Sequence, residues 1–475
     1  MSRFAVQTRG RALVAAMLAM AIPLLLSCCT TLHPDARARH ATAYIASLET
    51  LTAQALPADE PLGLDRCITI ALENNLAVRM AAIDAALAHL NKNMAFADFL
   101  PRVTATASAT TWSQQPASTI GGLFQAPTHD QTLRQYGIDV QMPVLMPATW
   151  FAYSMRRHGE AAGALAAELT RQAIVLEVTS RYYQCLARMA SVASMESQLA
   201  QATALAGELE ALHAEGLVLD WELEAARVNV LARQTMLRES QGLTRLAQVE
   251  LLQSMGLAPM AALALRPDAP FEPTSAPVED LIYQALLGHP ALHLADREHA
   301  MTADRAKQAI AAFLPGLSSF LSLAGTSNTT SIPARNVYGG LAGVLTVFDG
   351  FANVQEYQAA RQRKAKAVLA REERCLAVMA QVFGAHLNER LSGEYLDVAA
   401  RHLAVQEARL TAVEARADEG LALASERLDA RALRDEAEME WTHLNYRHQL
   451  SAALLRHAMG VPFDGTGGDA ACESK

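Results

Sequence analysis

The sequence predicts a mainly α-helical fold with a smaller β part: long antiparallel helices that form a coiled-coil barrel, and four strands per chain. Three observations support this prediction. Small helix-forming residues dominate, since 51% of the residues are hydrophobic but only 5% are aromatic, and 93 of the 475 residues are alanine. Two long stretches, 148–258 and 334–461, contain no proline, which would interrupt a helix. The chain also contains two copies of a unit of roughly 200 residues.

The first 27 residues have the layout of a bacterial secretory signal peptide. Three arginines precede an apolar run from Ala12 to Leu26, which is too short for a membrane-spanning helix. The run ends in Leu-Leu-Ser-Cys at residues 25–28, which resembles the lipoprotein signal motif. Cys28 is therefore predicted to carry a covalent lipid, and residues 28–63 to form an N-terminal anchor arm. The alternative is an ordinary cleaved signal with an incidental Cys-Cys pair.

The internal repeat organises the rest of the chain. Residues 64–101 align with 278–315 at a constant offset of 214, and residues 215–256 align with 419–460 at an offset of 204. We therefore expect a first copy at 64–259 and a second at 278–461, with a linker at 260–277 and a C-terminal tail at 462–475.

Each copy is expected to contain a short helix, a very long helix and a return helix. The short helices are predicted at Leu64–Leu100 and Val278–Leu314. Within the proline-free stretches, the best turn points are the Gly-Leu pairs, Gly216-Leu217 and Gly420-Leu421. These turns give, in each copy, a helix of about 70 residues followed by an antiparallel helix of about 40 residues.

Between the short and the long helix of each copy, apolar and polar residues alternate. This pattern predicts strands at about 102–113 and 133–145 in the first copy, and at about 316–327 and 336–348 in the second. Each is long enough for a tilted strand to cross a bilayer. The alternative is a soluble hairpin packed on the helices.

A membrane location would require several chains to share one sheet. Four strands cannot close a barrel, and open sheet edges are not tolerated in hydrocarbon. Two chains would give about eight strands and a filled interior, whereas three would give about 12 strands and room for a pore. A homotrimer with a shared 12-stranded β-barrel is thus the smallest assembly that could conduct.

With these features the sequence resembles the TolC/OprM-type family of outer-membrane efflux proteins. The features that carry the resemblance are the paired helix starts at Ala71 and Ala285, the two Phe-Leu-Pro helix ends, the Val-Phe-Asp-Gly segment at 347–350, and the two Gly-Leu turns. The resemblance implies a trimeric outer-membrane barrel continued by a helical tunnel across the periplasm. Gly216, Leu217, Gly420 and Leu421 would form the tip that docks a periplasmic membrane-fusion adaptor and an inner-membrane transporter of the RND, MFS or ABC type.

The resemblance also implies an acidic constriction near this tip. The matching residues are Glu426 and Asp429, three apart on one helix face, with Glu222 at the equivalent distance past the first turn. In a trimer each would form a ring of carboxylates that favours cations. The alternative is that they are solvated coiled-coil residues paired with Arg227, Arg427 or Arg431.

Other functions fit the sequence less well. The net charge of -9 and the lack of a basic run argue against nucleic acid as a partner. No phosphate-binding loop, nucleophile elbow or zinc-protease motif is present, so neither an enzyme nor a cofactor is predicted. His289, His293 and His299 have no acidic residue at a ligand-like spacing, and no metal site is expected. The expected function is a passive efflux conduit for small molecules; type I protein secretion and a non-conducting coiled-coil lipoprotein remain as alternatives.

Overall fold

The computed structural model describes residues 34–56, 61–120, 124–267, 276–329, 331, 333–422 and 424–461. The chain divides into two units, residues 1–60 and residues 61–475. The first unit contains the helix α2 (Pro34–Ala55). The signal segment, Cys28 and the tail at 462–475 lie outside the described residues.

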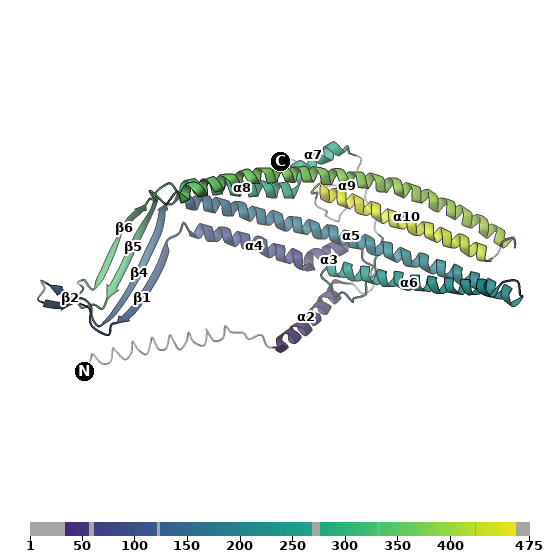
Figure 1. The fold of residues 1–475 in the computed structure, drawn as a ribbon, viewed down its shortest axis with the longest axis horizontal. Coiled ribbons are helices and arrows are strands. Elements are labelled where there is room, and N and C mark those ends of the chain that lie inside the picture. Colours follow the sequence, from purple (N-terminus) through teal and green to yellow (C-terminus); the bar gives the residue numbers. More distant parts are fainter. Residues whose placement is uncertain are drawn as a thin grey trace. The chain divides into compact units, whose positions relative to one another are not determined.

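The second unit contains long helices and a sheet (Figure 1). Two successive runs of elements have the same order, apart from a short extra hairpin in the first run. The first run is α3 (Leu64–Asn74), α4 (Leu76–Ala97), β1 (Arg102–Thr111), β2 (Ala117–Ile120), β3 (Phe124–Pro127), β4 (Thr132–Leu145), α5 (Pro147–Ala214) and α6 (Asp220–Ser254). The second run is α7 (Val278–Gly288), α8 (Pro290–Ala311), β5 (Gly316–Thr326), β6 (Arg335–Val344), α9 (Ala352–Asp418) and α10 (Ala424–Ala458).

The long helices turn at the two Gly-Leu pairs. α5 and α9 contain 68 and 67 residues, and their return helices α6 and α10 contain 35 residues each. α5 packs on α6, and α9 packs on α10, as antiparallel pairs. None of the described helices combines the length and the apolar character needed to cross a bilayer.

Each predicted short helix is in fact two helices, so the prediction of single helices at Leu64–Leu100 and Val278–Leu314 was wrong. The breaks fall at Asn75 and His289, whose backbones are extended. Each side chain caps the helix that follows: the Asn75 side-chain oxygen accepts from the N–H of Ala77 at 2.7 Å, and His289 Nδ1 accepts from the N–H of Ala291 at 3.1 Å.

The breaks make room for the ends of the return helices. Gly256, just after α6, has a φ of +74°, and a Cβ there would lie 2.7 Å from the carbonyl oxygen of Asn74. Gly460, just after α10, would place a Cβ 2.8 Å from the Cα of His289. A continuous helix through Asn75 or His289 would therefore have to displace a closely packed helix end.

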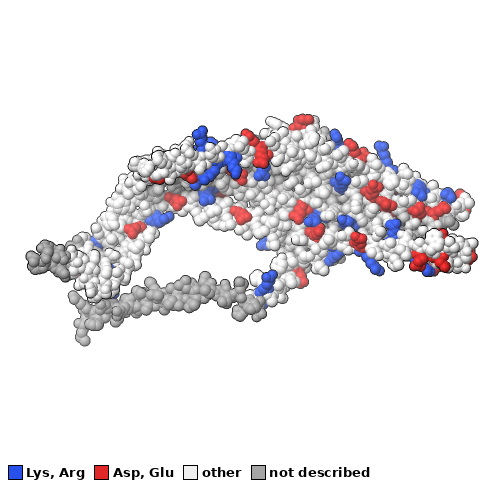
Figure 2. Space-filling model, in the orientation of Figure 1, with Lys and Arg blue, Asp and Glu red and all other residues white. Residues whose placement is uncertain are grey.

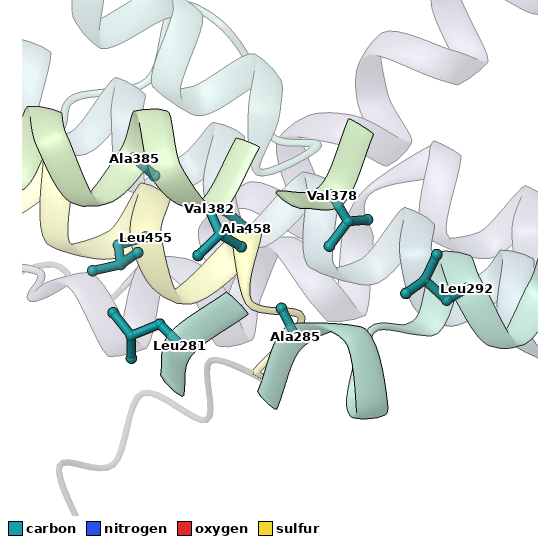
Figure 3. Packing of buried hydrophobic residues seen from close by; sticks show 8 residues of the cluster. All are labelled: Leu281, Ala285, Leu292, Val378, Val382, Ala385, Leu455 and Ala458. Atoms are coloured by element: carbon teal, nitrogen blue, oxygen red, sulfur yellow. The ribbon is translucent and has the colours of Figure 1, made fainter. Parts of the chain in front are cut away.

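The hydrophobic core of the second run lies where four helices meet (Figure 3). Its members are small or branched aliphatic residues, all less than a tenth exposed, which allow the helices to approach closely. They are Leu281 and Ala285 of α7, Leu292 of α8, Val378, Val382 and Ala385 of α9, and Leu455 and Ala458 of α10.

The sheet has the strand order β1-β4-β5-β6, and all neighbouring strands are antiparallel. The strands end where their partners end: β1 stops at Thr111, opposite Thr132, and β6 stops at Val344, opposite Gly316. β6 is therefore shorter than the predicted 336–348. The turn-rich segment between β1 and β4 forms a separate pair of short strands, β2 and β3.

Candidate functional site

The four-stranded sheet has one apolar and one polar face. Residues directly opposite each other on neighbouring strands share a face of the sheet. One row across the four strands, on the polar face, consists of Thr104, Asp139, Ser322 and Tyr338. Ser322 donates a hydrogen bond to Asp139 at 2.6 Å. The neighbouring row on the other face joins Val103, Val140, Leu321 and Gly339. The strands carry only four charged residues, Arg102, Arg134, Asp139 and Arg335.

The elements of the two runs lie in one lateral order. In the sheet, β4 and β5 are central, and β1 and β6 are the edge strands. In the helical part next to the sheet, α4 packs on α5, α5 on α8, and α8 on α9. Further from the sheet, α6 packs on α5, α5 on α10, and α10 on α9. The first run therefore always supplies one side and the second run the other, with α5 in the middle.

The two Gly-Leu turns close the far ends of the helix pairs. Gly216 and Gly420 have φ values of +74° and +73°, a conformation that glycine adopts without strain. In each turn the glycine N–H donates a hydrogen bond to the carbonyl three residues earlier, and the leucine N–H donates to the carbonyl five residues earlier. The N–H of Leu217 lies 3.0 Å from the Leu212 carbonyl oxygen, and that of Leu421 lies 2.8 Å from the Arg416 carbonyl oxygen. Both leucine side chains are about two thirds exposed, at 69% and 65%.

The first turn carries further exposed apolar side chains beside its leucine. Leu219 and Trp221 are 60% and 66% exposed there. The residue at the equivalent position of Trp221 in the second copy is Ser425. Sequence analysis singled out the glycines and leucines and missed Trp221, although a large aromatic residue beside a predicted exposed turn is a readable signal.

The three acidic residues singled out from the sequence lie near the starts of α6 and α10: Glu222 and Glu426 on the first turn, and Asp429 on the second. Glu222 accepts a hydrogen bond from the backbone N–H of Leu219 at 3.0 Å and so caps the start of α6. Glu426 lies 3.8 Å from Arg416, and Asp429 lies 3.4 Å from Arg409. Both arginines belong to α9, so they are not Arg427 or Arg431, the partners that the sequence suggested. The third suggested partner, Arg227, pairs with Glu210 and Glu224. The side chains of Glu426 and Asp429 are about half exposed, at 47% and 49%.

A hydrogen bond joins the two helix pairs near their tips. The backbone N–H of Ser425, at the start of α10, donates to the carboxylate of Glu208 on α5 at 2.9 Å. A carboxylate at a helix N-terminus is also favoured by the helix dipole. This contact joins residues 217 positions apart, and no sequence pattern pointed to it.

Of the three histidines considered as metal ligands, His289 is engaged in a helix cap. Nδ1 of His289 is occupied by the N–H of Ala291. Burial, followed by the charges of His457, Arg374 and His293, holds the pKa of His289 below its usual value. Over the described ranges, no group of three or more His, Cys, Asp or Glu side chains is placed to hold a metal ion.

Comparisons with known proteins agree with this geometry. Residues 281–461 match the family model described as outer membrane efflux protein. A comparison with curated proteins gives no match.

Among solved structures, the CmeC outer membrane channel of Campylobacter jejuni is 16% identical, with a TM-score of 0.72 over 84% of this chain and 85% of that one. The outer membrane protein VceC of Vibrio cholerae is 17% identical, with a TM-score of 0.68 over 84% and 96%. The MtrE outer membrane channel of Neisseria gonorrhoeae is 15% identical, with a TM-score of 0.62 over 84% and 88%. At these identities the likeness to solved structures concerns the fold.

Proposed function

We propose that this chain, whose residues 281–461 match the family model of outer membrane efflux proteins, forms the outer-membrane channel of a tripartite efflux system. Three copies form a passive conduit, with a 12-stranded barrel in the outer membrane and a helical tunnel in the periplasm. An inner-membrane transporter supplies the energy, and small toxic molecules are the cargo.

The observation that carries this proposal is the shared lateral order of strands and helices. Within the part of the chain that the structure describes, the outer edges of β1 and β6 are unpaired. At the same two sides, α4 and α9 form the limits of the helical layer. Sheet edges in hydrocarbon must be paired. Pairing β6 of one copy with β1 of the next provides hydrogen-bond partners for both edges. The same arrangement brings α9 of the first copy beside α4 of the second.

The exposed faces of these two helices fit such a contact. On α4, six apolar residues follow a heptad spacing, and each is at least half exposed: Leu76, Met80, Ile83, Leu87, Leu90 and Met94. On α9, exposed apolar residues recur about every seven residues, as at Leu369, Leu376, Phe383, Val398 and Val405. Among the described residues, no helix covers either of these exposed seams, and a neighbouring copy supplies the partner.

The ends of the molecule have complementary roles in this proposal. The apolar face of the sheet contacts lipid and the polar face lines the pore. The Gly-Leu tips, with Leu217 and Leu421 exposed, dock the periplasmic adaptor. Rings of Glu426 and Asp429, with Glu222 beside them, constrict the tunnel entrance, and the adaptor opens it by untwisting the tip helices. Cys28 carries the lipid that anchors the N-terminal arm in the outer membrane.

The test is the assembly and conductance of the purified full chain. In detergent it should migrate as a heat-resistant trimer, and in a planar bilayer it should form ion-conducting pores. A monomer, or a trimer that does not conduct, would contradict the proposal and favour a coiled-coil envelope protein without a pore. Labelling with radioactive palmitate, with Cys28→Ala as the control, tests the anchor separately.

A further inference from the structure

Positive charge gathers at the junction between the helices and the sheet. The segments 92–102, 147–160, 304–311 and 349–366 flank this junction and contain ten Lys and Arg but five Asp and Glu, a difference of +5 in a chain whose net charge is -9. Figure 2 shows Lys and Arg gathered over the part of α8 and α9 near the sheet, beside strands that are almost free of charge.

Three of the five acidic residues of these segments form ion pairs with some of the cations. Glu160 lies 2.7 Å from Lys92, Asp304 lies 2.8 Å from Lys307, and Glu356 lies 3.1 Å from Arg363. Arg305 also pairs with Glu356, at 3.3 Å. Hydrogen bonds from Arg363 and Arg305 lower the pKa of Glu356.

Six cations of the junction remain exposed and form no ion pair with another described residue. We call them the junction cations: Arg102 of β1, Arg156 and Arg157 of α5, and Arg361, Lys364 and Lys366 of α9. Arg361 and Lys364, three residues apart on α9, lie on one helix face and repel each other. Such a cluster favours an anionic partner, and neutralisation by that partner relieves the repulsion.

The junction cations lie close to the end of the apolar sheet. α5 begins two residues after β4 ends. Arg156 and Arg157 are therefore about 15 Å along α5 from its start, and Arg361 to Lys366 about 14 to 21 Å along α9. A headgroup layer extends roughly 5–8 Å beyond the hydrocarbon. Long Lys and Arg side chains lying toward the membrane can shorten the remaining distance.

We propose that the junction cations bind anionic phospholipid headgroups of the periplasmic leaflet of the outer membrane. The inference rests on the proposed function, which places the sheet in that membrane. Arg156, Arg157 and Arg361 can each hold a phosphate through two parallel N–H groups. Lys364 and Lys366 add point charges one helical turn further from the sheet. A multivalent basic surface of this kind selects charged over zwitterionic lipid.

The experiment compares the full chain in two kinds of nanodisc, one of phosphatidylcholine alone and one of equal parts phosphatidylcholine and phosphatidylglycerol. The readout is the thermal midpoint of unfolding. For the natural chain, phosphatidylglycerol should raise the midpoint, and high salt should remove at least half of this gain because exposed charges are screened. The variant Arg156→Gln/Arg157→Gln/Lys364→Gln/Lys366→Gln should lose at least half of the gain at low salt.

A matched control removes four exposed cations far from the sheet: Arg66→Gln/Arg79→Gln/Arg238→Gln/Arg401→Gln. This control should keep the full gain. An equal loss in both variants, an undiminished gain in the first, or no gain in the natural chain would overturn the proposal. Conductance in a phosphatidylcholine bilayer is measured in parallel. A junction variant that conducts normally but whose thermal midpoint does not rise with phosphatidylglycerol supports lipid binding. A natural chain that does not conduct contradicts the proposed function instead.

Discussion

The carboxylate of Glu208 accepts a hydrogen bond from the backbone N–H of Ser425 at 2.9 Å and thereby joins the two helix pairs near their tips. Removing this acceptor leaves the α10 N-terminus without its charged partner, at a cost of about 1 kcal/mol. Glu208→Ala should therefore loosen the closed tip and raise the leak conductance in planar bilayers.

The control for this prediction is Glu210→Ala. Glu210 pairs with Arg227 at 2.7 Å, which is a contact within the first helix pair. This substitution should leave the leak unchanged, because it does not separate one helix pair from the other. An equal leak in both variants would show that Glu208 acts only as one more surface charge.

Glu426 and Asp429 should affect conduction more than stability. Both side chains are about half exposed, and ion pairs of this kind contribute about 1 kcal/mol or less. The double variant Glu426→Ala/Asp429→Ala should keep its thermal midpoint within a few degrees but raise the leak or reduce cation selectivity, measured from reversal potentials in a salt gradient. If leak and selectivity both stay as in the natural chain, the acidic-ring assignment is wrong.

His289 should make the break between α7 and α8 sensitive to acid. Its folded pKa is lowered from 6.5, first by burial and then by His457, Arg374 and His293, so the neutral form is favoured in the folded chain. Its contribution is therefore fully present above the unfolded pKa and is lost as the pH falls from 6.5 through the lower folded pKa. Protonated Nδ1 also cannot accept from Ala291, which removes a helix cap that contributes about 1 kcal/mol.

The repeat provides matched variants for this prediction. Asn75 occupies the equivalent position in the first copy and caps α4 without titrating. His289→Asn should reduce the loss of hydrogen-exchange protection in α7 and α8 on acidification, and Asn75→His should introduce such a loss in α3 and α4. Unchanged pH profiles in both variants would contradict the assignment.

Two glycines with the same backbone conformation should differ in their tolerance of alanine. Gly216 and Gly256 both have a φ of +74°, which costs an alanine about 1–2 kcal/mol. A Cβ at Gly216 meets no atom within 4 Å, whereas one at Gly256 would lie 2.7 Å from a backbone oxygen of Asn74. Gly256→Ala should cost a further roughly 1–3 kcal/mol through overpacking. Comparing the thermal midpoints checks this, and equal shifts would contradict it.

Much of the helical part could be predicted because its signals are local. The absence of proline and the two Gly-Leu pairs indicated the long helices and their turns. The break at Asn75 was missed because Ala and Leu continue on both sides of it, and only the packed helix end at Gly256 requires it. The break at His289 did have a local signal, since Pro290 disfavours a helical backbone at the residue before it. Spacing on one helix placed Glu426 and Asp429 on a common face, but their arginine partners come from α9. Sequence neighbours such as Arg427 do not predict a contact between antiparallel helices.

The types of the elements follow from local sequence, because helix propensity, residue alternation and glycine turns act over a few residues. The lateral order, with α5 at the centre and α4, α9, β1 and β6 at the sides, follows from the packing of the folded chain. This packing also brought Glu208 to Ser425 and gathered the cations of α5 and α9 at one level below the sheet. The reason is physical: these arrangements depend on which helix faces bury each other across more than a hundred residues, and such pairings leave no periodic trace in the sequence.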